Sequence, residues 1–317
     1  MFPAASVILF TTASGAGLGL LAWLALLALL GLAPATTAFG LTAFGLALGM
    51  LSLGLMSSIF HLGRPERALK ALTQWRSSWL AREGVAALAT YAATGPFALG
   101  WIVLNRTDSA FAFAAAASLA MSLTTIFCTA MIYASLKPIR QWSNRWTAPV
   151  YLLLAAASGG LLVVDLTSVM GGFRPAFGFA AAALVVISAA AKLAYWRHTD
   201  AEPPRSTLAT ATGLASFGSV RLLEQPHTEE NFIMREMGFR IARKHAAKLR
   251  RLAIVLLFVA PGLLIVAATL LAGVSTAATA GLALLATLCA ALGLGVERWL
   301  FFAQATHVSM LYYGRAP

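Results

Sequence analysis

Ser57-Ser58-Ile59-Phe60-His61-Leu62-Gly63-Arg64-Pro65 and, further along, Ser77-Ser78-Trp79-Leu80-Ala81-Arg82-Glu83 join two long apolar segments. The first segment ends with a histidine and the second begins with a glutamate. Between them, Leu69, Leu72 and Trp75 have the spacing of one helix face, and several of the other positions are basic: Arg64, Arg67, Lys70 and Arg76. This pattern predicts a short amphipathic connector, residues 62–80, lying in the interface of a membrane.

The composition excludes a soluble protein. The chain has 317 residues, of which 60% are hydrophobic and 11% charged, and its mean hydropathy is +0.80. Since a membrane-spanning helix needs about 20 mainly apolar residues, these values predict an all-α polytopic membrane protein. Eight runs are long enough to span: 7–33, 36–61, 80–104, 109–136, 147–170, 175–197, 251–273 and 276–301.

An even number of spans places both termini on one side. We call this side face X; it carries the connectors 62–79, 137–146 and 198–250. Of the 23 lysines and arginines, 21 fall on face X and only Arg106 and Arg174 on the opposite face. The two short connectors, counted together with Arg82 just after the first of them, give eight against two. Because cytoplasmic loops are enriched in basic residues, face X, with both termini, is predicted to be cytoplasmic.

Three domains follow from the hydropathy: helices one to six (1–197), an extramembrane basic insert (198–250), and the last two helices with a short tail (251–317). The second half of the insert reads as a basic helix that runs into the seventh span. It suits a lipid headgroup surface or a docking surface for an acidic partner. The candidate docking residues are Arg76, Arg240, Arg243 and Lys244.

A few polar residues lie within the spans. Thr125, Thr129 and Tyr133 share one helix face, which either lines a polar pocket near face X or makes hydrogen bonds between helices. Asp165 is the deepest carboxylate. A carboxylate at that depth suggests a proton path, although it could instead reach the far interface or pair with Arg174.

The sequence excludes most redox centres and covalent chemistry. Its two cysteines cannot supply the four thiolates of an iron–sulfur cluster, and they form no zinc pattern. His61 and His307 lie at the membrane edge, so no buried histidine pair is available for a haem. No phosphate-binding loop or nucleophile motif is present. What remains is a polar rim on face X, where His61 and Glu83 are either interfacial caps or a site that handles a quinone and its protons.

The His61-Leu62-Gly63 connector, the Arg76–Glu83 segment and the eight spans resemble the membrane anchor subunit of dimethyl sulfoxide reductase, a relative of the polysulfide reductase membrane subunit. The segment from Pro226 to His245 is similar to a subset of that family. The resemblance implies a non-catalytic anchor in a bacterial inner membrane, without a redox centre of its own. It would hold an iron–sulfur electron-transfer subunit and a molybdopterin catalytic subunit, and exchange electrons with menaquinone or ubiquinone.

In that family a histidine of the His–Leu–Gly motif and a glutamate at the start of the next helix serve the quinol site, and they match His61 and Glu83. Arg64 is added here as a neighbour able to bond a quinone oxygen, and Tyr133 as a further lining residue; Glu83 and Asp165 are the candidate proton carriers. Two alternatives remain. A secondary transporter would show an inverted repeat and broken helices, and an inert anchor would hold its partners without a quinone site.

Overall fold

The computed structural model describes residues 3–34, 36–59, 66, 68–224, 229, 231, 234, 237 and 241–313. Within these ranges the chain is helical and contains no strand. The helices are α1 (Ala5–Leu29), α2 (Thr37–Ile59), α3 (Ala68–Ala71), α4 (Trp79–Ile102), α5 (Ser109–Ala134), α6 (Thr147–Met170), α7 (Pro175–Ala201), α8 (Leu208–Thr212), α10 (Ile241–Ile254), α11 (Ala260–Leu271) and α12 (Thr276–Ala303), with a π-helical segment η4 (Val255–Val259) and 3-10 turns η2 (Leu72–Gln74), η3 (Ala215–Phe217) and η5 (Val308–Tyr313).

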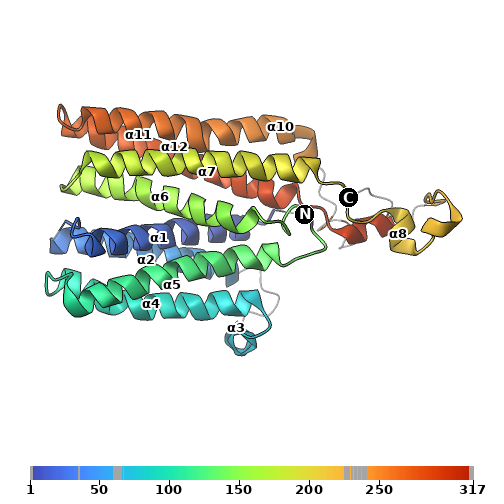
Figure 1. Ribbon diagram of the computed structural model, residues 1–317, viewed down its shortest axis with the longest axis horizontal. Helices are drawn as coiled ribbons and strands as arrows, with labels where there is room; N and C mark the ends of the chain where they lie inside the picture. The colour runs from blue at the N-terminus through green and yellow to red at the C-terminus, as the bar shows by residue number, and fades with distance from the viewer. Residues whose placement is uncertain are drawn as a thin grey trace.

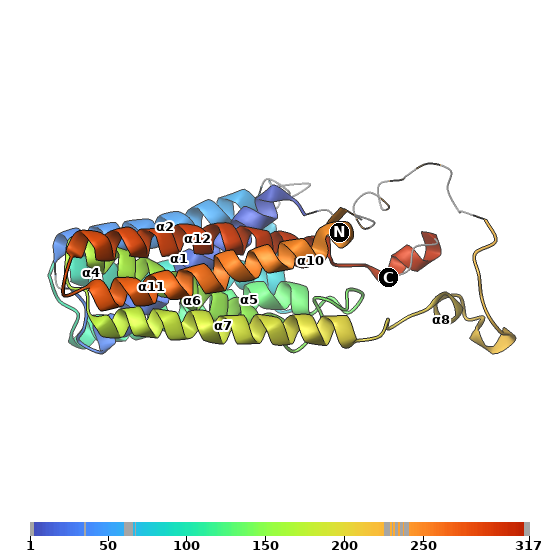
Figure 2. The same cartoon turned by 90° about the horizontal axis from the view of Figure 1, so that it is seen from above.

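Eight helical spans within the described ranges are long and apolar enough to cross a membrane, which confirms the predicted polytopic helical bundle. Figures 1 and 2 show them running nearly parallel, with α1 beginning and α12 ending at the same end of the bundle. That end, face X, also carries α3, α8 and η5. Large apolar side chains cover the outside of the spans, for example Phe113, Val186 and Leu292, as a lipid-facing surface requires.

The seventh span is built from three elements in one continuous run, α10, η4 and α11. The predicted basic helix therefore does continue into the span, from Ile241 onward. Pro261 lacks a backbone N–H and cannot donate to the preceding turn, and a π-helical segment just before a proline is one way for a helix to accommodate that loss.

The tightest helix crossing joins α1 to α6. A side chain at Gly19 would collide with the backbone of Ala155, and one at Gly159 with the backbone of Gly19. Close backbone approach at small residues is the usual way membrane helices associate. By contrast, a methyl group at Gly15, Gly45 or Gly49 would meet no other atom. Gly15 and Gly19, and Gly45 and Gly49, are glycine pairs four residues apart, and of these four positions only Gly19 makes a close helix contact.

The described part of the connector before α4 contains two short helical elements. Its described residues from Ala68 onward form the four-residue α3 and the turn η2, and residues 60–65 and 67 lie outside the described part. Arg82 closes it onto α4 by donating hydrogen bonds to the carbonyl oxygens of Trp75 (2.9 Å) and Arg76 (2.7 Å). The guanidinium of Arg82 also stacks over the Trp79 ring, 4.2 Å from its centroid. The connector is thereby held at a fixed place beside the first turn of α4.

Candidate functional site

Glu83 lies in the second turn of α4 and is 4% exposed. The helix begins at Trp79, where the Ser78 side chain accepts a hydrogen bond from the Ala81 N–H. Starting there places the Glu83 carboxyl on the side that faces α5. The Thr129 hydroxyl donates a 2.5 Å hydrogen bond to Glu83 Oε1. A buried carboxyl with this hydroxyl partner is able to accept and pass on a proton.

Further hydroxyl pairs continue along the α4–α5 interface. Thr90 and Thr125 are hydrogen bonded at 3.0 Å, and Thr94 and Ser118 at 2.8 Å. Two of the three residues predicted to share a face, Thr125 and Thr129, therefore contact α4. Tyr133, the third, packs among aromatic rings, 5.2 Å from Trp142, 5.5 Å from Phe301 and 5.3 Å from Phe302 between centroids.

A second buried polar group lies across the bundle, between α7 and α12. Lys192 and Arg298 both pair with Glu297: Lys192 Nζ contacts Glu297 Oε1, and Arg298 Nε donates to Glu297 Oε2 at 2.5 Å. The three side chains are 0–2% exposed. Charges buried in a membrane protein are costly and usually functional. The group carries one more positive than negative charge, so it attracts electron-rich ligand atoms.

Aromatic rings surround these charges. Lys192 Nζ lies 4.0 Å from the centroid of Tyr195 and 5.1 Å from that of Trp196, while Arg298 Cζ lies 4.1 Å from the centroid of Tyr151. Cation–π contacts of this kind partly replace the water that burial removes.

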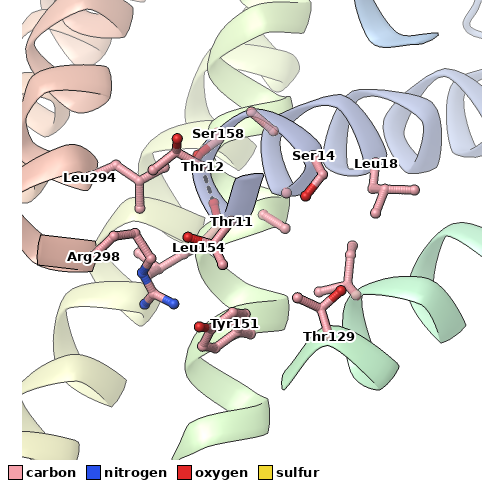
Figure 3. A pocket seen from close by; sticks show the side chains of 14 residues that line it. Thr11, Thr12, Ser14, Leu18, Thr129, Tyr151, Leu154, Ser158, Leu294 and Arg298 are labelled. Carbon is pink, nitrogen blue, oxygen red and sulfur yellow. Dashed lines mark hydrogen bonds between the residues drawn. The ribbon is translucent and has the colours of Figure 1, made fainter. Parts of the chain in front are cut away.

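A small cavity lies between the two buried groups. It has a free volume of about 20 Å³ and is lined by residues of α1, α5, α6 and α12, among them Thr129, Tyr151 and Arg298. Figure 3 shows Arg298 reaching toward Tyr151 on one side of the cavity and Thr129 on the other. Thr129, the partner of Glu83, thus links that carboxyl to the space beside Arg298. Counted at 1.5 Å per residue from their helix ends, the residues Glu83, Thr129, Tyr151 and Arg298 lie about 6–8 Å below face X.

Several predicted site residues fall outside this geometry. His61, Arg64 and Arg240 lie outside the described residues, as do the side chains of Arg243 and Lys244, whose backbone belongs to α10. Arg76 is exposed on the connector, with its guanidinium 5.5 Å from the Trp75 centroid. The docking roles of these basic residues stay predictions.

Near its C-terminal end, α10 is bound to α7 and to the residue after α12 by Arg250. Arg250 donates bidentately to Asp200 of α7 (2.6 and 2.9 Å) and to Gln304 (3.3 Å). Beside them a polar recess of about 490 Å³ opens at face X, with Arg140, Gln141 and Thr306 in its lining.

Asp165 is separate from the cavity. It sits on α6 across from Thr287 of α12. Neither Asp165 Oδ1 nor the Thr287 hydroxyl has a hydrogen-bond partner among the described residues. No contact with Arg174 is found in the described part of the chain. The predicted proton role of Asp165 remains untested, and its distance from Glu83 along the bundle leaves it outside the site near face X.

Sequence reasoning counted Lys192 only among the 21 basic residues of face X and missed that it is buried in a span; it also missed Tyr151 as a residue that lines the cavity. From the sequence, Glu297 and Arg298 form a charged pair at the end of the last span, where they either pair structurally or border the same pocket as His61. The available signal was the charge itself: Lys192 and Glu297 each stand in apolar helical sequence, where an unpaired charge is rarely tolerated.

Residues 1–314 match the sequence model of the family described as DMSO reductase anchor subunit (DmsC). The chain belongs to the DMSO reductase anchor subunit family. It is also 34% identical to a sulfite dehydrogenase subunit of Allochromatium vinosum, over 99% of both chains. No solved structure matches it.

The chain is therefore a multi-pass membrane anchor subunit of a molybdoenzyme-type oxidoreductase family. Membership implies association with a catalytic and an electron-transfer subunit. The transporter prediction is disfavoured by this membership. The described spans also lack the unwound segments that transporters place near the bilayer midplane; the π-helical η4 is the one irregular stretch among them.

Proposed function

We propose that this anchor binds quinone or quinol near face X and exchanges its electrons with an iron–sulfur subunit docked there, which serves a molybdopterin catalytic subunit. The observation that carries the proposal is the buried Glu83 carboxyl, hydrogen bonded to Thr129 beside a cavity that Arg298 also lines. Quinol oxidation releases two protons as well as two electrons. A carboxyl about 6 Å below the membrane face, at the start of α4, is suitably placed to carry these protons.

The partner's substrate is left open in this proposal. Sulfite is one candidate, since the relative from Allochromatium vinosum is named as part of a sulfite dehydrogenase. Face X is proposed to be cytoplasmic, and the basic residues Arg76, Arg240, Arg243 and Lys244 are proposed to contact the docked subunit. His61 and Arg64 are proposed to border the quinone, because the connector that carries them leads into the first turn of α4.

The test compares Glu83→Gln with wild type in the intact complex purified from native membranes. Two activities are measured: turnover coupled to a quinol or quinone, and turnover with a water-soluble dye that exchanges electrons directly with the partner subunits. We expect quinone-coupled turnover to fall by about 10²-fold or more, the usual contribution of a positioned acid or base, while dye-coupled turnover stays unchanged.

Thr94→Val is the matched control. It removes a buried hydroxyl from the same α4–α5 interface, where Thr94 bonds Ser118, but about 16 Å further along the helix than Glu83. It should leave both activities unchanged. If Glu83→Gln leaves quinone-coupled turnover unchanged, Glu83 does not carry the quinol protons; a wild-type complex that turns over with the dye but with no quinol would instead be an anchor without a quinone site. Metal analysis of the same preparation should find molybdenum or tungsten, iron and acid-labile sulfide.

A further inference from the structure

An apolar groove of about 300 Å³ lies between α1, α2, α6 and α12. Its rim includes Leu9 and Leu53, both more than one-third exposed, so it opens sideways toward lipid. Figure 2 shows α2 and α12 along the same edge of the bundle. Along α12 the groove runs from Leu294 to Thr287, which lie about 14 and 24 Å from the helix end at face X. It therefore lies at the depth of the lipid chains, below the headgroups.

The groove adjoins the polar cavity beside Arg298. Thr12, Ala16, Ser158 and Leu294 line both spaces. Figure 3 shows Thr12, Ser158 and Leu294 at one side of the cavity and Arg298 below them. A molecule in the groove can thus present one polar atom to the cavity past the Leu294 side chain.

Arg298 has an unused donor at this point. It is 2% exposed, yet its Nη2 atom has no hydrogen-bond partner among the described residues, although Nε is engaged by Glu297. A buried donor without a partner is destabilising, so such an atom usually marks a place where a ligand or water binds. The cavity admits little more than one water molecule, which is also the size of a carbonyl oxygen.

We infer that the groove holds the ring and isoprenoid tail of a quinone, with one ring oxygen in the cavity accepting a hydrogen bond from Arg298. This rests on the proposed quinone function and adds to it a head contact on α12 and a lateral entry between α2 and α12. A phospholipid fits less well, because its phosphate is too large for the cavity and would have to leave the headgroup layer.

The test fills the groove below the ring. Ala291 lines the groove about 10 Å along α12 from Arg298, beyond the reach of a quinone ring. In the intact complex, Ala291→Trp should lower kcat/KM for a quinol with a long isoprenoid tail by about tenfold or more, because the tail loses its apolar contacts. A tailless quinol of the same ring should be used with nearly unchanged kcat/KM. Leu292→Trp, at a 66% exposed position next to it, is the control and should change neither.

Arg298→Lys tests the head contact. It keeps a cation for Glu297 but removes the free guanidinium donor. We expect the tailless quinol to bind about 10–100-fold more weakly, the loss of one charged hydrogen bond, with dye-coupled turnover unchanged.

The groove assignment is overturned if Ala291→Trp and Leu292→Trp affect long-tailed and tailless quinols alike, or if native mass spectrometry finds a phospholipid that Ala291→Trp displaces. An unchanged tailless-quinol affinity in Arg298→Lys overturns the head contact. In both cases wild type still turns over with quinol. A wild-type complex active with the dye but inert with every quinol would instead refute the proposed function itself.

Discussion

Glu297 should be the member of the buried ion group whose loss destabilises the fold most. Glu297→Gln leaves Lys192 and Arg298 as two buried cations with no counter-charge, whereas Lys192→Met or Arg298→Met leaves one complete ion pair. Leaving a buried charge uncompensated costs about 3–5 kcal/mol. Removing either cation should cost only about 1–2 kcal/mol, the usual loss for a buried contact.

Thermal unfolding in detergent with a thiol-reactive fluorescent dye measures these differences. Cys128 is 5% exposed on α5 and becomes reactive only when the bundle opens. Replacing the more accessible Cys289 with alanine in every variant leaves Cys128 as the reporter. The expected melting temperature of Glu297→Gln is lower than that of either cation variant by on the order of 10 °C.

The triple variant Glu297→Gln, Lys192→Met, Arg298→Met provides the decisive comparison. With no charge left in the site, it should recover part of the stability lost in Glu297→Gln, because well-packed apolar groups often replace a buried ion group at little cost. The reasoning would be refuted by equal melting temperatures for the three single variants, or by a triple variant no more stable than Glu297→Gln. Either result would show that an uncompensated buried charge does not cause the loss of stability.

Three further predictions concern other parts of the chain. Gly19→Val should prevent assembly of a folded bundle, since the side chain meets the backbone of α6, while Gly15→Ala should express like wild type. Size-exclusion chromatography should show a monodisperse peak for Gly15→Ala and none for Gly19→Val. Asp165→Asn should lower proton translocation by reconstituted vesicles without slowing electron transfer, and equal proton-to-electron ratios would exclude Asp165 from a proton path. Burial lowers the pKa of His307, which lies outside the spans and accepts a hydrogen bond from the Ser309 N–H at 3.1 Å. The unfolded segment then binds protons more readily than the folded one, so η5 should lose hydrogen-exchange protection as the pH falls below about 6.5, and His307→Gln should remove that pH dependence.

Much of the fold could be predicted from the sequence because hydropathy acts locally. A span needs only enough consecutive apolar residues to satisfy the bilayer, so the eight helices and their shared end at face X follow from the order of residues alone. The helix start at Ser78-Trp79 and the continuation of the basic helix into the seventh span are also local features. The family resemblance rested on the same local signals, the His61-Leu62-Gly63 connector and the glutamate that follows it.

Only the tertiary structure decided which side chains meet. The buried and the lipid-facing sides of the spans are both mainly apolar, so periodicity alone does not tell one side from the other. That choice is made by close packing between distant residues, such as Gly19 against Gly159, which sets the rotation of α1 and α6. It places Thr129 beside Glu83 and turns Lys192 inward to Glu297, residues that are 46 and 105 positions apart in the chain. Since such contacts depend on the arrangement of all the helices at once, the sequence provided the charges and the bundle determined their partners.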